Sequence, residues 1–347
     1  MNEAIARLLP GPLDIHAHVV PADLMRRLAG GARAGFGVEV TDGARRLMIG
    51  GEPMRMPVMP AMDNVEMRLK AMEEQGVAAQ LVSPWVALCN YRLDEADGIW
   101  FAQTVNEAIA DFCRAMPDRF AGIGAAPLQA PEKAAAMVAP MMGELGLLGV
   151  EINTTLGPET FLDDPSLDPF WAAAEEEGAF VFIHPSLGGT GKQFERYYLN
   201  NLIHNPLETT VAAAHLIFGG VMERFPRLKV CLVHGGGYLP YALGRFRRGR
   251  LMRAETKVSM SGAVEDAFRR FYFDTVTHSA SALEFLVGEA GAEHVLLGSD
   301  YPFDMADPDL VGTVKRAELG QAAERLVLRG GAERVLGANT GVPLSAG

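Results

Sequence analysis

The sequence has few of the features that mark secreted and membrane proteins. Of its 347 residues only three are cysteines, and their number and spacing match no disulfide framework. We therefore expect free, mostly buried thiols in a reducing compartment. The first ten residues lack the apolar core of a signal peptide, and Pro140, Glu144 and His215 interrupt the longest apolar stretches. These absences favour a cytoplasmic protein with no membrane span. The cysteines are Cys89, Cys113 and Cys231.

The sequence also lacks an excess of positive charge. Its formal net charge is −12, which argues against a nucleic-acid partner because such a partner requires a basic surface. An anionic substrate stays compatible with this charge, since a binding site needs positive charge only locally. With 49% hydrophobic and 21% charged residues, the composition is that of a soluble enzyme with a large core.

Short apolar runs alternate with longer segments of helical periodicity along the whole chain. Eight runs predict strands, and they are almost continuously apolar, as parallel strands buried on both faces should be. This alternation predicts a single (β/α)8 barrel domain covering residues 1–347. The predicted strands are 13–18, 78–84, 120–127, 147–153, 180–185, 229–235, 271–276 and 294–300. The predicted helices are 64–75, 95–116, 131–145, 167–177, 209–225, 239–250 and 280–288, with a last one within 308–336.

One region does not follow the alternation. Residues 35–60 contain short strand patterns around turns at Asp42-Gly43 and Gly50-Gly51. We interpret this region as a small β insertion in the loop after the first strand. Such loops lie at the carboxyl-terminal face of a barrel, where barrel enzymes place their active sites.

Side chains able to bind a metal stand at the ends of several predicted strands. His16 and His18 end the first strand, and their spacing places both imidazoles on one face. His184, His234 and Asp300 end the fifth, sixth and eighth strands. A single histidine at a strand end is more often structural, but five such groups at one level of a barrel suit a divalent ion and its chemistry. The other histidines, His204, His215, His278 and His294, are interpreted as structural.

The fourth predicted strand indicates how many ions the site holds. It ends Val150-Glu151-Ile152-Asn153, with no lysine. A second metal in such a barrel usually needs a bridging ligand at this place, so we predict one ion. His234 then remains free as an acid–base group. The glycines that follow it, Gly235 to Gly237, allow a substrate to approach the backbone closely. A lipase-type oxyanion loop is excluded because no Gly-x-Ser-x-Gly motif is present.

These motifs together resemble the amidohydrolase superfamily, and specifically its aminocarboxymuconate-semialdehyde decarboxylase-like branch. The resemblance covers nearly the whole chain, and its most specific pieces are the His-Gly-Gly-Gly and Gly-Ser-Asp-Tyr-Pro sequences. The matching segments are residues 14–18, 72–77, 181–185, 233–237 and 297–303.

The resemblance implies a barrel that holds one metal ion, zinc or in some relatives manganese. It assigns His16, His18, His184 and Asp300 as ligands, and His234 as the group that polarises the metal-bound water together with Asp300. It also implies that Arg55 on the insertion binds a substrate carboxylate. Arg245 matches a second carboxylate-binding arginine, which the family's prototype takes from the neighbouring subunit; the other interpretation of Arg245 is a solvated helix face.

The expected function is non-oxidative decarboxylation of an aromatic or muconate-type carboxylic acid, with no organic cofactor and in a homodimer or larger homo-oligomer. The loop at 186–196 has no tryptophan where the prototype has one, which leaves the substrate open. The alternative is hydrolysis of a C–C, ester or amide bond with the same metal-activated water. A catalytically inactive binding protein is a third interpretation, disfavoured because all five polar site residues are present.

Overall fold

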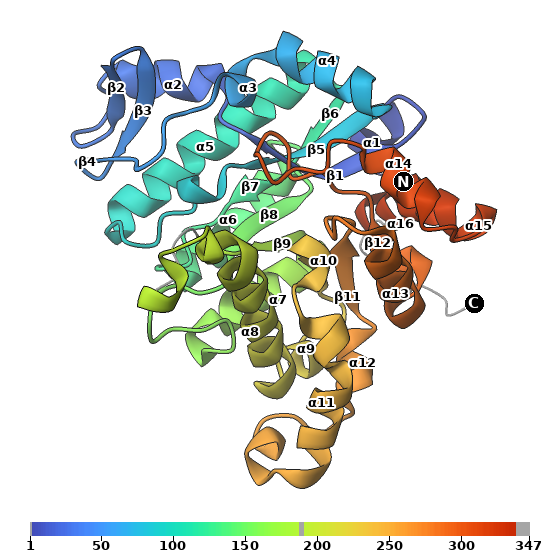
Figure 1. Ribbon diagram of the computed structural model, residues 1–347. Coiled ribbons are helices and arrows are strands. Elements are labelled where there is room, and N and C mark those ends of the chain that lie inside the picture. The colour runs from blue at the N-terminus through green and yellow to red at the C-terminus, as the bar shows by residue number, and fades with distance from the viewer. Residues whose placement is uncertain (1, 187–190, 338–347) are drawn as a thin grey trace.

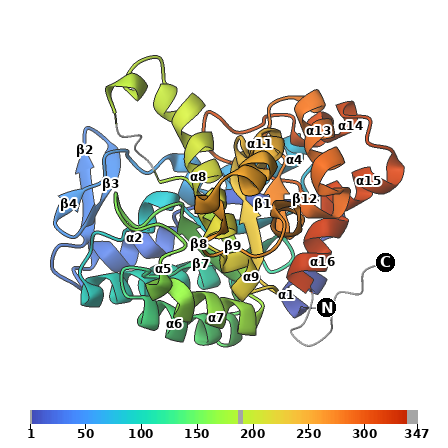
Figure 2. The same ribbon diagram turned by 90° about the horizontal axis from the view of Figure 1, so that it is seen from below.

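Parallel strands form the interior of the structure and helices lie around them (Figures 1 and 2). The computed structural model describes residues 2–186 and 191–337. One parallel sheet has the order β1-β5-β6 and the other the order β12-β11-β10-β9-β8-β7. The strands are β1 (Leu13–Val19), β5 (Ala79–Pro84), β6 (Phe120–Gly122), β7 (Gly124–Ala125), β8 (Gly149–Asn153), β9 (Phe180–His184), β10 (Lys229–Leu232), β11 (Phe271–Asp274) and β12 (Val295–Leu296).

The two sheets are continuous through a single segment of chain. The predicted third strand, 120–127, divides at Ile123, so that β6 pairs with β5 while β7 pairs with β8. Ile123 itself still donates a hydrogen bond of 3.0 Å to the carbonyl of Val82. The predicted strand therefore lies where it was expected, but the structure has two short strands there in place of one continuous strand.

The other edges of the two sheets also meet, through residues that follow β12. The predicted eighth strand, 294–300, is shorter in the structure, but the chain beyond it runs alongside β1. Ile15 donates to the carbonyl of Leu297 at 2.8 Å, Asp300 donates to His16 at 2.8 Å, and His18 donates to Tyr301 at 2.7 Å. These bonds place Asp300 beside the two histidines of β1.

An irregularity in β1 decides where its side chains point. Asp14 pairs with Gln80 and Ala17 pairs with Val82, so three steps along β1 match two steps along β5. This is the register of a β-bulge, which turns part of a strand relative to its neighbour. As a result His18 lies opposite Ser83, and Asp14 lies opposite Gln80. The side chains of Asp14 and Gln80 are on the side of the sheet that faces α4.

The helices cover the strands, and several begin and end at the residues expected from the sequence. Asn64 caps α4 by accepting a hydrogen bond from the amide of Met67, and Gly76 ends this helix in a left-handed conformation. The predicted helix 209–225 begins earlier and divides into α8 and α9 at Gly219 and Gly220. The helices are α1 (Glu3–Arg7), α2 (Ala22–Ala29), α3 (Pro60–Asp63), α4 (Val65–Gln75), α5 (Glu95–Ala115), α6 (Pro131–Gly143), α7 (Asp168–Glu177), α8 (Asn205–Phe218), α9 (Val221–Arg224), α10 (Val233–Gly236), α11 (Leu239–Met252), α12 (Val264–Phe268), α13 (Ala280–Ala290), α14 (Leu310–Arg316), α15 (Gln321–Arg325) and α16 (Gly331–Gly337).

The region predicted as a β insertion is a three-stranded antiparallel sheet. Its strands are β2 (Gly37–Thr41), β3 (Ala44–Ile49) and β4 (Glu52–Pro53), and its turns fall at the predicted pairs Asp42-Gly43 and Gly50-Gly51. In Figure 1 this sheet lies beside α2, at the edge of the molecule. The loop after β9 was predicted to be long; its residues 187–190 lie outside the described residues.

The strands are buried on both faces, as the apolar runs predicted. All seven residues of β1 and all five of β9 are buried. Cys89, Cys113 and Cys231 are free, and only Cys113 is partly exposed. Among the helices in the described part of the chain, none combines the length and the apolar character needed to cross a bilayer.

Candidate metal centre

Four side chains predicted as metal ligands converge at the carboxyl-terminal ends of the strands. One ligand atom from each of the four lies within 4.8 Å of one from every other. The Nε2 atoms of His16 and His18 are 3.1 Å apart, and each lies 3.3 Å from Oδ1 of Asp300. All four residues are buried. They are His16, His18, His184 and Asp300.

The chemistry of this cluster fits a divalent cation. Nε2 of His184 and Oδ1 of Asp300 are buried and have no hydrogen-bond partner among the described residues. Leaving such atoms without a partner is costly, and a cation in contact with both would remove that cost. Three imidazoles and one carboxylate are the ligands that zinc and neighbouring metals prefer.

The far nitrogen of each clustered histidine is held by the surrounding structure. Nδ1 of His16 lies 2.7 Å from Oδ2 of Asp274. Nδ1 of His18 lies 3.1 Å from the carbonyl of Pro84, and Nδ1 of His184 lies 3.0 Å from the carbonyl of Pro185. Acceptors at Nδ1 place the proton there and leave Nε2 free to bind a metal, which is how ligand histidines are usually oriented.

Asp274 is a residue of this site that the sequence reasoning missed. Besides holding His16, its carboxylate accepts hydrogen bonds from the amides of His234 at 2.9 Å and Gly235 at 2.7 Å. It therefore links a ligand histidine to the loop that carries His234. The only signal in the sequence was a carboxylate inside the predicted strand 271–276; the structure ends β11 at Asp274 and so places it at the site.

His234 faces the cluster from a left-handed turn. The predicted sixth strand ends at Leu232 rather than Gly235 because His234 has φ 57° and Gly235 has φ 61°. Nε2 of His234 lies 3.6 Å from Oδ2 of Asp300, which also has a positive φ of 66°. Such backbone conformations are uncommon for residues other than glycine and concentrate at functional sites. Glycine is required at Gly237, where a Cβ would stand 2.1 Å from the carbonyl oxygen of Pro206.

The electrostatics of the cluster favour bound positive charge. Burial alone would lower the pKa of His16, but the Asp300 and Asp274 carboxylates outweigh burial and raise that pKa to about 10. Burial would raise the pKa of Asp300, yet the neighbouring histidines hold it well below its usual range. Burial lowers the pKa of His18 and of His184. In the metal-free protein one proton is thus held mainly by His16.

The two arginines expected to bind substrate lie outside this cluster. Arg55 follows β4 and Arg245 lies on α11, and both side chains are exposed. Among the described residues, neither makes a hydrogen bond or ion pair with the clustered histidines or Asp300. The exposed His278 is also separate from the cluster, while His215 pairs with Asp163 at 2.8 Å.

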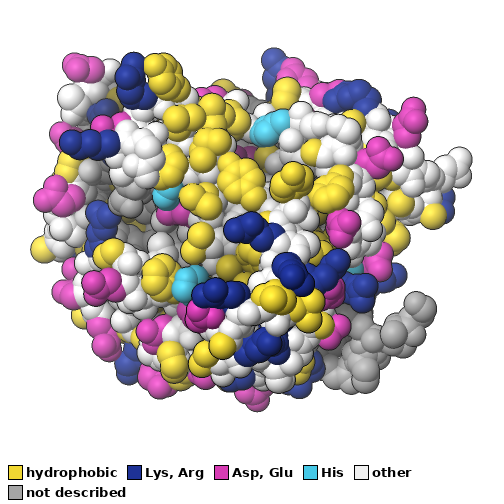
Figure 3. Space-filling view, turned by 60° about the horizontal axis from the view of Figure 1, so that its bottom comes forward, with side chains coloured by type: hydrophobic (Ala, Val, Ile, Leu, Met, Phe, Trp, Pro, Cys, Tyr) yellow, Lys and Arg dark blue, Asp and Glu magenta, His cyan; other side chains and the backbone are white. Residues whose placement is uncertain are grey.

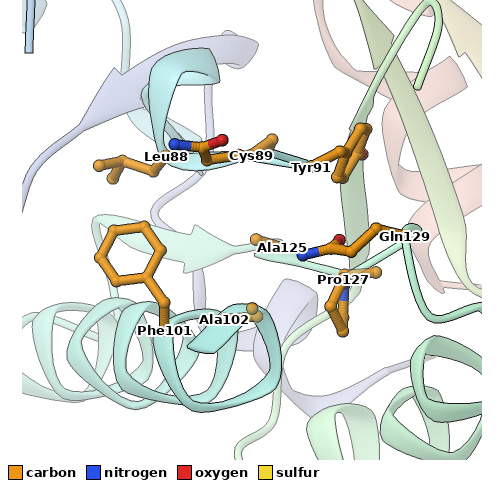
Figure 4. Close-up of a pocket in the computed structure, with 11 residues that line it drawn as sticks. Leu88, Cys89, Tyr91, Phe101, Ala102, Ala125, Pro127 and Gln129 are labelled. Carbon is orange, nitrogen blue, oxygen red and sulfur yellow. The ribbon is translucent and has the colours of Figure 1, made fainter. Parts of the chain in front are cut away.

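A small cavity lies beside the ends of β7 and β8. Figure 4 shows its walls, formed by the segment after β5, the start of α5 and the segment after β7. Its volume is about 10 Å³, which is room for a single water molecule and far too small for an aromatic acid. The labelled lining residues are Leu88, Cys89, Tyr91, Phe101, Ala102, Ala125, Pro127 and Gln129.

Comparison with known proteins identifies the family. The amidohydrolase family model Amidohydro_2 matches residues 13–338 of the chain. The chain belongs to the amidohydrolase superfamily. It is 31% identical over 332 residues to 2-amino-3-carboxymuconate-6-semialdehyde decarboxylase of Dictyostelium discoideum, covering 94% of this chain and 91% of the relative. This places the amidohydrolase in the aminocarboxymuconate-semialdehyde decarboxylase-like branch.

Solved structures have the same fold. 5-Carboxyvanillate decarboxylase LigW from Sphingomonas paucimobilis matches with a TM-score of 0.79 and 26% identity, over 94% of this chain and 99% of that one. A dihydroxybenzoic acid decarboxylase from Polaromonas sp. JS666, solved with manganese and 2-nitroresorcinol, matches with a TM-score of 0.76 and 21% identity. That second match covers 95% of this chain and 97% of the other.

Glu151 is a second residue of the amidohydrolase site that was not assigned a role from the sequence. It lies on β8, is fully buried, and its Oε2 is 3.7 Å from Nδ1 of His18. Neither of its carboxyl oxygens has a hydrogen-bond partner among the described residues. Burial raises the pKa of Glu151 from 4.5 to about 8, so most of this side chain is protonated at neutral pH.

We predict that Glu151→Gln makes the metal-free protein more stable at alkaline pH. In the folded chain Glu151 keeps its proton up to a pH of about 8, whereas in the unfolded chain it loses it near 4.5. The folded state therefore binds more protons in this window, and wild-type stability falls as pH rises through it. The difference in Tm, variant minus wild type, should grow from about pH 5 to about pH 8 in chelator-treated protein.

The control for this experiment is Glu176→Gln, which removes an exposed carboxyl group. We expect the Tm of that variant to follow the wild type at every pH. A Tm difference for Glu151→Gln that is the same at all pH values would contradict the assignment of a buried, neutral carboxyl group.

Proposed function

We propose that this amidohydrolase releases CO2 from an aromatic or muconate-type carboxylic acid, using one divalent metal ion and no organic cofactor. The observation that carries the proposal is the cluster of three histidines and one aspartate, with His234 facing it from a strained turn. The decarboxylases to which the chain is similar act on acids of these two kinds.

We also propose that the strands close into one (β/α)8 barrel domain over the full chain. The hydrogen bonds between β1 and residues 297–301 support this closure, because they join the outer edges of the two parallel sheets. Closure would leave all the strand ends at one face, around the metal cluster. The free cysteines support a reducing compartment such as the cytoplasm.

The metal ligands in this proposal are His16, His18, His184 and Asp300. A bound divalent ion would supply Lewis acidity and a positive charge that binds an anionic oxygen of the substrate. Three imidazole ligands favour zinc, and the manganese in the Polaromonas relative makes that ion the second candidate.

In this proposal, His234 and Asp300 deliver the proton that the reaction needs. His234 Nε2 and Asp300 Oδ2 are 3.6 Å apart, so a closer approach in the substrate complex, or one bridging water molecule, would let a proton pass between them. Proton delivery to the carbon that bears the carboxylate interrupts the conjugation of the substrate. Heterolysis of the bond to the carboxylate then returns its electron pair to the ring or diene and releases CO2, which restores conjugation. Asp274 holds the His234 turn in place during these steps.

Substrate binding and assembly form the remaining part of the proposal. We propose that Arg55 binds a second carboxylate or a phenolate, and that Arg245 does so in the site of a neighbouring subunit. Figure 3 shows a face on which apolar side chains gather beside lysines and arginines. Exposed apolar residues of α8 and α11 and of the segment before α8 support a homodimer or larger homo-oligomer. They are Tyr197, Tyr198, Leu202, Ile203, Leu207, Val211, Tyr241, Leu251 and Met252.

A product screen of the metal-loaded protein tests the proposed reaction. We expect CO2 in stoichiometric yield with the decarboxylated acid from at least one hydroxybenzoate, dihydroxybenzoate or muconate semialdehyde. CO2 and organic fragments are measured separately, because hydrolysis by the same site would instead release a second organic fragment. Two organic products without CO2 would establish the hydrolase and refute the decarboxylase.

Replacing His234 tests its role in proton transfer. We expect His234→Asn to lower kcat by about 10²- to 10⁴-fold while metal content is unchanged, because the variant loses the acid–base group. Asparagine tolerates the positive φ at this position. His278→Asn is the matched control, since His278 is exposed and has φ 53°. Near-normal decarboxylation by metal-loaded His234→Asn would show that another group moves the proton.

Each metal ion that binds should release a defined number of protons. Because His16 is protonated in the metal-free protein while burial keeps His18 and His184 neutral, we expect about one proton released per ion near neutral pH. Calorimetric titration with zinc in two buffers of different ionisation enthalpy measures this number. Release of two or three protons would mean that groups besides His16, either the other histidines or the buried Glu151, also give up protons when metal binds.

A further inference from the structure

Behind the histidines of β1 lies a buried cation that the proposed function does not use. Arg68 of α4 is 1% exposed, and among the described residues it has no carboxylate as an ion-pair partner. Burying a guanidinium without an ion-pair partner is costly, and a methionine would fill the same space without that cost. Packing alone therefore does not explain an arginine at this position.

Arg68 donates its hydrogen bonds to the strands that carry the cluster. Nη2 donates to the carbonyl of His18 at 2.5 Å, and Nη1 donates to Oε1 of Gln80 at 3.0 Å. The guanidinium also lies over the ring of Tyr301, with its carbon 4.8 Å from the ring centroid. Arg68 thus contacts one ligand residue, His18, and the residue that follows another, Asp300.

Gln80 extends this contact to Asp14. The Nε2 atom of Gln80 donates to Oδ2 of Asp14 at 2.9 Å, while its Oε1 accepts from Arg68. Because one end of the amide accepts and the other donates, the side chain bridges a cation and a carboxylate that do not touch. The bulge in β1 makes this bridge available, since it leaves Asp14 opposite Gln80 on the side of α4.

Asp14 then binds the segments on both sides of the metal cluster. Its carboxylate accepts from the amide of His16 at 3.0 Å, and from both the amide and the hydroxyl of Ser299, at 3.0 and 2.7 Å. Ser299 immediately precedes Asp300. The chain of contacts Arg68–Gln80–Asp14 therefore fixes the backbone at His16, His18 and Asp300, three of the four clustered residues.

We propose that Arg68 is a positioning residue of the metal site, which holds His16, His18 and Asp300 in binding geometry before the ion arrives. This inference rests on the metal site proposed above. A site whose ligands are already in place binds an ion without a further cost of ordering them. Loss of Arg68 should therefore weaken metal binding beyond what a general loss of stability would cause.

The test measures zinc affinity by competition with a chelator, together with the Tm of the metal-free protein. We expect Arg68→Met and Gln80→Met each to weaken zinc binding by about 10- to 100-fold, as loss of residues that orient metal ligands commonly does. Arg68→Lys should be intermediate, because one ammonium group cannot reproduce the two-armed contact to His18 and Gln80.

Met72→Ala is the matched control for stability. Met72 lies on the same helix and is fully buried, but in the structure as described no hydrogen bond joins its side chain to Arg68, Gln80 or Asp14. This variant should lower the Tm of the metal-free protein while its zinc affinity stays within about twofold of wild type. Equal loss of affinity in Met72→Ala and Arg68→Met would show a merely structural role and overturn the inference.

The remaining outcomes separate this inference from the proposed function. Wild-type zinc affinity in both Arg68→Met and Gln80→Met would overturn the positioning role alone. If Arg68→Met does not fold, Gln80→Met decides, because it is uncharged and similar in size to glutamine. A wild-type protein that binds no zinc or manganese would overturn the proposed metal site itself, and this inference with it.

Discussion

The backbone hydrogen bonds between β1 and residues 297–301 are the contact on which the site depends. They join the beginning of the chain to a segment nearly 300 residues later, and they place Asp300 between His16 and His18. Every other feature of the site is arranged around this contact. Asp14 strengthens it from one side by binding both His16 and Ser299, and Asp274 holds His16 and the His234 turn from another.

The charges around this contact explain why the site suits a cation. Three aspartates are buried around this contact, where burial disfavours the charged form of a carboxyl group, and each is bound by several hydrogen-bond donors or histidines. They are Asp14, Asp274 and Asp300. Within the described residues Arg68 supplies buried positive charge on the helix side, and His16 holds a proton on the cluster side. A divalent ion in place of that proton adds positive charge where the carboxylates converge.

The candidate ligands could be found from the sequence because each stands at or just past the end of an apolar run, where parallel strands meet at one edge. Asp274 and Glu151 lie inside predicted strands, two residues before their ends, and nothing in the sequence separates a carboxylate that orients a ligand from one that only pairs with neighbouring backbone. Arg68 could not be found at all, since one arginine in an amphipathic helix normally faces solvent. The bulge in β1 is likewise invisible, because it depends on the partner strand β5.

The alternation of strands and helices, the insertion with its two glycine turns and the residues able to bind a metal can all be read from the amino-acid sequence. These follow from local periodicity and turn chemistry, which neighbouring residues decide. The folded chain was needed to show which face of β1 carries its histidines, how far His234 stands from Asp300, and which groups hold each imidazole. Those features depend on register and on contacts between residues far apart in the chain, and no local pattern encodes them.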